Sequence, residues 1–188
     1  MQRARSRLLM IVPLTLVAIL VILLVATRSL VKTSIVLLAV PFSLVGAIWL
    51  VHLLGYNWSI AVWVGLIALA GLDAETGVVM LLYLDLAYER WKIDGKLVGL
   101  RALAEAVEHG AVQRLRPKAM TVTTTFIALL PILWATGTGS DVMRRIAAPM
   151  VGGVVTSFIA ELVIYPAVFF VWKSREVRRL LSSGEEGS

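Results

Sequence analysis

The stretch VGLIALAGLDAETGVVMLLYL, residues 64–84, decides how the rest of the chain can fold. It is apolar, rich in glycine and alanine, and long enough to cross a lipid bilayer. Two acidic residues, Asp73 and Glu75, lie near its middle. A charged carboxylate at that depth costs roughly 2.5–3.5 kcal/mol on insertion scales, so acidic residues inside spans are usually functional. We interpret the remaining segments as the helices and flanks that support this one.

The composition is that of an integral membrane protein. Of the 188 residues, 59% are hydrophobic, and the mean hydropathy is +0.88. Both values exceed those of soluble globular domains. The net charge of +6 comes from basic residues between apolar runs, which indicates membrane topology rather than nucleic-acid binding. The sequence contains no cysteine, which excludes a disulfide framework or a thiolate metal site within it.

Five apolar runs predict an all-α, polytopic membrane protein with five transmembrane helices in residues 8–173. Helices are expected because lipid offers no partner to backbone amide and carbonyl groups. Another segment, residues 97–115, has its apolar residues in a helical stripe, which is typical of an amphipathic helix on the membrane surface. The predicted spans are residues 8–26, 35–54, 60–86, 120–135 and 146–172.

Basic residues in the loops predict the orientation. They are concentrated in the first loop, the third loop and the tail, residues 174–188, which the positive-inside rule places in the cytoplasm. Five spans then put the three arginines of residues 1–7 outside, against the same rule. Because large translocated domains escape the rule, we interpret residues 1–7 as the end of an external domain of a longer protein. The alternative is an inverted first span, or an N-terminus held in the cytoplasm.

The two acids of residues 64–84 cannot form one paired site. Asp73 and Glu75 are two residues apart, so on a helix they point about 200° away from each other. The functional interpretation is that at least one of them carries protons in a transporter. The alternative is a buried acid that is satisfied by serine, threonine or a backbone carbonyl group.

Three more residues are candidates because of their positions in the spans. Lys118 precedes a threonine cluster; it either extends to the lipid headgroups or is the cationic partner of Glu75. Glu161 is a costly acid near the middle of its span, with no evident partner. The thioether of Met143 can bind a soft ion such as Cu(I), although most methionines in helices only fill space.

The sequence does not predict an enzyme. It contains no nucleophile elbow, no phosphate-binding loop, and no metal-ligand spacing around its two histidines. An intramembrane hydrolase that uses Asp73 or Ser140 is the weaker alternative.

Three motifs together resemble the C-terminal membrane half of resistance-nodulation-cell division transporters, specifically the heavy-metal efflux group of copper/silver Cus type. The motifs are LIALAGLDAETGVVMLLYL (66–84), HGAVQRLRPKAMTV (109–122) and LLPILWATGTGSDVMRRIAAPMVGG (129–153). The resemblance implies the last five spans of a twelve-span subunit of the bacterial inner membrane. It also implies a homotrimer that works with a periplasmic adaptor and an outer-membrane channel. Such a pump exports Cu(I) or Ag(I) in exchange for protons and uses no cofactor.

The resemblance also implies roles for individual residues. Glu75 matches the acidic relay residue of the family's tenth span, Lys118 matches the relay lysine of the eleventh, and Met143 matches a methionine of the export path. The relay further needs an aspartate of the fourth span, which this chain lacks. Asp73 has no family role and stays a candidate for an additional proton site. The alternatives are a truncated, non-functional or non-catalytic remnant, or a pump of this family for a divalent metal or a drug.

Overall fold

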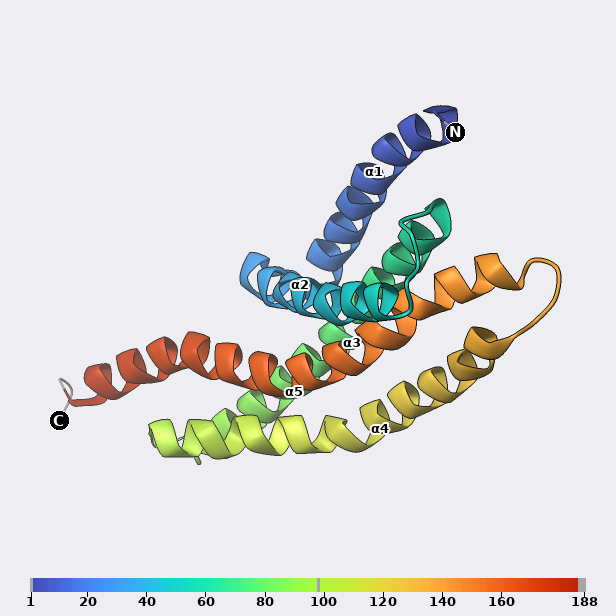
Figure 1. The fold of residues 1–188 in the computed structure, drawn as a ribbon. Helices are drawn as coiled ribbons and strands as arrows, with labels where there is room; N and C mark the ends of the chain where they lie inside the picture. The colour runs from blue at the N-terminus through green and yellow to red at the C-terminus, as the bar shows by residue number, and fades with distance from the viewer. Residues whose placement is uncertain (1, 98, 186–188) are drawn as a thin grey trace.

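The computed structural model describes the backbone of residues 2–97 and 99–185, and the side chains of residues 13–97 and 99–178. Every regular element in these residues is an α-helix, which confirms the predicted all-α class. Figure 1 shows that α4 and α5 lie side by side in opposite directions, that α2 lies across α5, and that α1 projects away from the others. The helices are α1 (Gln2–Thr27), α2 (Leu30–Leu53), α3 (Ile60–Ile93), α4 (Leu100–Trp134) and α5 (Ser140–Glu185).

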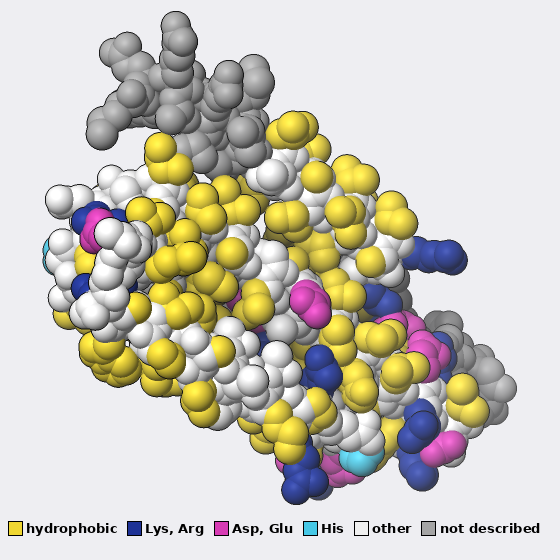
Figure 2. Space-filling model, turned by 90° about the vertical axis from the view of Figure 1, so that its right-hand side faces the viewer, with side chains coloured by type: hydrophobic (Ala, Val, Ile, Leu, Met, Phe, Trp, Pro, Cys, Tyr) yellow, Lys and Arg dark blue, Asp and Glu magenta, His cyan; other side chains and the backbone are white. Residues whose placement is uncertain are grey.

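Four of these helices contain a segment long and apolar enough to cross a membrane: α2, α3, α4, and Ser140–Arg178 of α5. In α1 the apolar helix within the searched residues is Pro13–Thr27, which is shorter than a span. The first of the five predicted spans therefore stays a prediction. Hydrophobic side chains form a broad band over the face shown in Figure 2, and most charged side chains lie at the two ends of this band. This distribution is expected for a surface that faces lipid.

The helices differ most from the predicted segments in α4 and at the end of α5. The structure has one continuous helix, α4, where the sequence predicted a surface helix (97–115) and a separate span (120–135). Only Pro117 interrupts the helical pattern between these segments, and a proline can bend a helix without ending it. The bend in α4 is visible in Figure 1. Lys118 consequently lies well inside a helix. Similarly, α5 extends to Glu185, into the segment predicted as the tail.

Helices α2 and α5 approach each other closely enough for their backbones to touch. Small residues recur at every fourth position of α5 between residues 148 and 160, a pattern that favours close helix packing. A Cβ atom built on Gly46 of α2 would lie 2.5 Å from the carbonyl oxygen of Gly152. A Cβ atom on Gly152 would lie 2.7 Å from the Cβ atom of Leu50. The two backbones therefore touch where only glycine fits.

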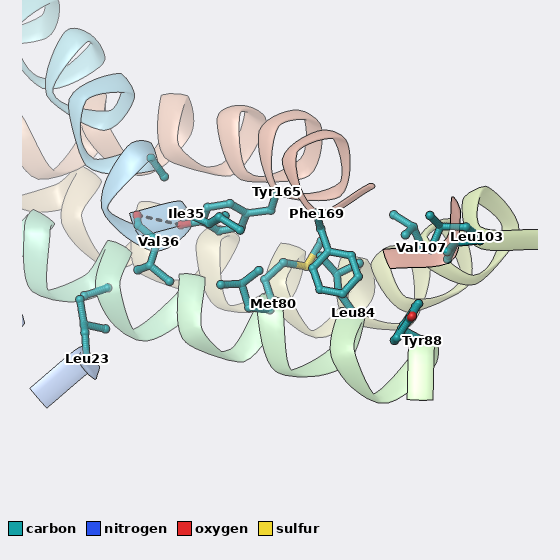
Figure 3. Close-up of a cluster of buried hydrophobic side chains, with 14 residues drawn as sticks. Leu23, Ile35, Val36, Met80, Leu84, Tyr88, Leu103, Val107, Tyr165 and Phe169 are labelled. Carbon is teal, nitrogen blue, oxygen red and sulfur yellow. Dashed lines mark hydrogen bonds between the residues drawn. The ribbon is translucent and has the colours of Figure 1, made fainter. Parts of the chain in front are cut away.

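Buried apolar side chains form two clusters, separated along the helix axes. Figure 3 shows the larger one, in which the hydroxyl group of Tyr165 donates a hydrogen bond of 3.3 Å to the carbonyl oxygen of Val36. We term these the Tyr165 cluster and the Leu69 cluster. The Tyr165 cluster consists of Leu23, Ile35, Val36, Ala39, Ala74, Met80, Leu81, Leu84, Tyr88, Leu103, Val107, Tyr165, Phe169 and Val177. The Leu69 cluster consists of Ala47, Val51, Val62, Leu66, Leu69, Ala148 and Val154.

The glycine contact between α2 and α5 leads to a stability prediction. In Gly152→Ala, the added methyl group meets the backbone of α2, and overpacking of this kind typically costs about 1–3 kcal/mol. We expect the free energy of unfolding, measured in mixed detergent micelles, to fall by that amount. Gly71→Ala is the matched control, because no heavy atom lies within 4 Å of its Cβ position. Equal stability of the two variants would contradict the contact.

Candidate functional site

Between the two apolar clusters lies a group of polar side chains contributed by four helices. Asp73 and Glu161 are 0% exposed and Lys118 is 3% exposed, and Ser43 and Ser157 are also buried. In α2, α3 and α5, the Leu69 cluster lies on one side of these positions along the helix and the Tyr165 cluster lies on the other. We term the group the polar layer; it consists of Ser43 from α2, Asp73 and Thr76 from α3, Lys118 from α4, and Ser157 and Glu161 from α5.

Glu161 is the centre of the polar layer. Its Oε2 atom forms an ion pair with the ammonium group of Lys118. Its Oε1 atom accepts a hydrogen bond of 2.8 Å from the hydroxyl group of Thr76 and lies 3.0 Å from the hydroxyl oxygen of Ser157. The carboxyl group of Glu161 thus has a cation on one oxygen and hydroxyl groups on the other, an environment that stabilises a carboxylate.

Asp73 is less completely satisfied than Glu161. Its Oδ1 atom lies 2.6 Å from the hydroxyl oxygen of Ser157. Its Oδ2 atom is buried and has no hydrogen-bond partner among the described residues. Ser43 and Lys118 lie close enough to interact with this carboxyl group. Ser157 therefore bridges two carboxyl groups, one paired with a cation and one only partly hydrogen-bonded.

Helical spacing explains why these side chains meet. Asp73 and Thr76 are three residues apart on α3, and Ser157 and Glu161 are four apart on α5, so each pair lies on one face of its helix. Lys118 reaches the same level because α4 is continuous from Leu100. An ammonium group buried without its carboxylate would be strongly unfavourable, so the pair holds α4 against α5.

Glu75 occupies the other side of α3. It is exposed whereas Asp73 is buried, as the predicted angle between the two side chains requires. The structure does not bring Glu75 to Lys118, whose ion-pair partner is Glu161. Gly71, one turn before Glu75, is also exposed, with open space in front of it. This side of α3 is thus unpacked around a carboxylate, although it belongs to an apolar helix.

Met143 lies away from the polar layer. It is in the first turn of α5 and is 58% exposed. In the part of the chain that the structure describes, no cluster of three or more histidine, cysteine or acidic side chains could hold a metal ion. The role of Met143 as a metal ligand stays a prediction.

Sequence reasoning identified Asp73 and Lys118 but not the partners that join them. The sequence shows no partner for Glu161, and it does not mark Ser157 or Thr76 as candidates. The available signal was depth: these polar residues all fall near the middle of long apolar helices. Lys118 lacked that signal, because the predicted break before residue 120 placed it at a helix end.

Comparisons with known proteins point to one family. Residues 1–173 match the profile of the AcrB/AcrD/AcrF family. The chain is 47% identical over 178 residues to "Cation efflux system protein CusA" of Escherichia coli (strain K12), and 45% identical over 178 residues to "Putative cation efflux system protein SilA" of Salmonella typhimurium. Each match covers 93% of this chain and 17% of the relative, so the chain spans about a sixth of their length.

A solved structure gives the same result for the fold. The crystal structure of a heavy metal efflux pump, crystal form II, superposes with a TM-score of 0.76 and is 34% identical in sequence. The superposition covers 90% of this chain and 16% of that chain. The identities confirm the resemblance to Cus-type heavy-metal transporters that the three sequence motifs indicated.

The ion pair of the polar layer leads to a stability prediction. Glu161→Leu leaves Lys118 buried without its partner, and removing one member of a buried pair costs about 3–5 kcal/mol. We expect a loss near the lower end of this range, because Asp73 stays close to Lys118. The free energy of unfolding in mixed micelles measures it.

The double variant Glu161→Leu with Lys118→Met is the control for this experiment. It removes both charges while keeping similar side-chain volumes, so it should recover most of the lost stability. If the double variant were as unstable as Glu161→Leu, the two side chains would not form the pair described.

Proposed function

The chain belongs to the AcrB/AcrD/AcrF family, and from this premise we propose that it forms the C-terminal membrane part of a proton-driven pump that exports Cu(I) or Ag(I). The protein is a multi-pass protein of the inner membrane, as its apolar helices and its relatives indicate. The identity to proteins named CusA and SilA, extending over 93% of the chain, supports a metal cation as the cargo.

The position of Glu75 supports proton transport by this pump. Its carboxyl group is exposed on an apolar helix, where contact with lipid would be costly for the charged form. We therefore assign the face of α3 around Gly71 and Glu75 to contact with the N-terminal half of the pump. The aspartate that the family relay requires would approach Glu75 there, and glycine at residue 71 permits a close approach.

In the proposed cycle, Glu75 binds a proton on one side of the membrane and releases it on the other. The neutral form permits a conformational step that the charged form opposes. A membrane potential of 100 mV supplies about 2.3 kcal/mol for each charge moved, so a few protons suffice to drive a cation uphill. Lys118, which the family resemblance assigns to the same relay, is buried near Asp73 on the opposite side of α3 from Glu75 and contributes a positive charge there.

The proposed assembly follows the family pattern. The complete subunit forms a homotrimer in the bacterial inner membrane, with the C-terminus in the cytoplasm, and works with a periplasmic adaptor and an outer-membrane channel. Met143, at the exposed start of α5, offers a thioether to the metal on its export path.

A chimera tests the proton role of Glu75. The matching segment of E. coli CusA is replaced by this chain, and copper and silver tolerance is measured in cells that lack their own copy. We expect the chimera to restore tolerance and the chimera with Glu75→Gln to lose it while still assembling, because glutamine cannot exchange a proton. Glu105→Gln, on the exposed face of α4, is the control. Full tolerance with Glu75→Gln would reject the assignment, and tolerance to zinc or a drug alone would reject the cargo.

The same chimera tests the metal role of Met143. Met143→Leu keeps the size and apolar character of the side chain but removes the sulfur, so export of Cu(I) and Ag(I) should fall. Met120→Leu is the matched control, because Met120 is exposed to a similar degree on α4. Uptake of radioactive silver into everted vesicles measures export directly. An equal effect of the two substitutions would contradict a role for Met143 in transport.

A further inference from the structure

The polar layer contains two carboxyl groups that share a single hydroxyl group. Ser157 Oγ lies 2.6 Å from Asp73 Oδ1 and 3.0 Å from Glu161 Oε1. A serine hydroxyl group has one proton to donate and can otherwise only accept. Two ionised carboxylates would both need that proton. The contacts are satisfied together only when one of the acids is protonated and itself donates to Ser157.

Charge balance leads to the same conclusion. With both acids ionised, Asp73, Glu161 and Lys118 would leave one net negative charge in a group that is at most 3% exposed. An uncompensated buried charge is strongly unfavourable, and such a group takes up a proton instead. With one proton on the acids, the group is neutral.

Among the described residues, no second cation neutralises the extra negative charge in place of that proton. On α4, the guanidinium group of Arg114 is one turn before Lys118, over the ring of Tyr83, and pairs with neither acid. On α5, the hydroxyl group of Tyr165 is committed to the carbonyl oxygen of Val36. From α2, the packed group is the neutral hydroxyl of Ser43. Glu75 points to the opposite side of α3.

We propose that Asp73 and Glu161 form a carboxyl pair that binds one exchangeable proton, bridged by Ser157 and balanced by Lys118. The proton resides on Asp73, because Glu161 already has the ammonium group and the Thr76 hydroxyl to stabilise its charge. The arrangement is Asp73 O–H to Ser157 Oγ, and Ser157 O–H to Glu161 Oε1. The buried, unpartnered Oδ2 atom of Asp73 is then the carbonyl oxygen of a neutral acid.

This site is separate from the one assigned to Glu75 and rests on the proposed function only for its use in transport. In the release step a water molecule accepts the proton as hydronium, the electron pair of the Asp73 O–H bond stays on the carboxyl oxygen, and a second carboxylate then lies beside Lys118. The ammonium group then faces two anions on two helices, so α3 and α5 are drawn into a new position around α4. The Leu69 and Tyr165 clusters on either side exclude water from the polar layer in the arrangement described, so water exchanges the proton only in an arrangement in which one of the clusters has opened.

Infrared spectroscopy of the protonated carboxyl group tests the proposal without requiring transport. The 188-residue chain carrying Glu75→Gln, which removes the other acid at membrane depth, is studied in micelles of a detergent without carbonyl groups, and its carboxylic acid C=O band is recorded at neutral pH. We expect one such band, lost in Asp73→Asn and in Glu161→Gln, because either change leaves a neutral pair with Lys118. Lys118→Met should about double it, because two acids without a cation both bind protons.

Two further variants serve as controls, with helix content checked by circular dichroism. Ser157→Ala should keep the band and shift its frequency, because the acid loses its acceptor; a merely structural role of Ser157 would leave the frequency unchanged. Glu105→Gln should leave the band as it is. A band that is absent from the Glu75→Gln chain, or that survives when Asp73→Asn and Glu161→Gln are each added to it, would overturn the proposal. If the chain shows the expected band but the chimera exports no metal, only the proposed function is overturned.

Discussion

The arrangement of α3, α4 and α5 depends on the ion pair between Lys118 and Glu161. Both side chains are removed from solvent, and neither could remain charged there without the other. Apolar packing alone would tolerate several rotations of helices whose membrane-spanning segments are largely apolar. The pair, and the hydroxyl groups that complete it, select one register of α4 and α5. The apolar clusters above and below then exclude water from that level.

Helix α3 separates two acidic sites by its own thickness. Asp73 points into the polar layer and Glu75 points out toward the unpacked face. Because the helix backbone joins them rigidly, a rotation of α3 that changes the surroundings of Glu75 also moves Asp73 relative to Ser157. Coupling between sites requires a shared element of this kind with two arrangements. The two proposed proton sites would then respond to the same movement.

The sequence predicts those features of the site that depend only on the periodicity of a helix, such as the direction in which a side chain points. The opposite directions of Asp73 and Glu75 follow from the geometry of a regular helix. The sequence does not predict properties that depend on how the helices combine. Whether a helix continues past Pro117 is decided by packing on both sides of the proline, so the depth of Lys118 was not accessible. For the same reason Glu161 had no visible partner, since that partner comes from another helix.

The pairing of Lys118 with Glu161 can be measured directly, because the chain contains no cysteine. Lys118→Cys is combined with Glu161→Cys in one chain and with Glu75→Cys in another. Each chain is treated in the membrane with a short thiol-specific cross-linker. The first is then cleaved between α4 and α5 and the second between α3 and α4, so that the two fragments stay joined only if the cysteines were cross-linked. The structure predicts that the first pair becomes cross-linked and the second does not. Cross-linking of residue 118 to residue 75 alone would contradict the polar layer and the proton site built on it.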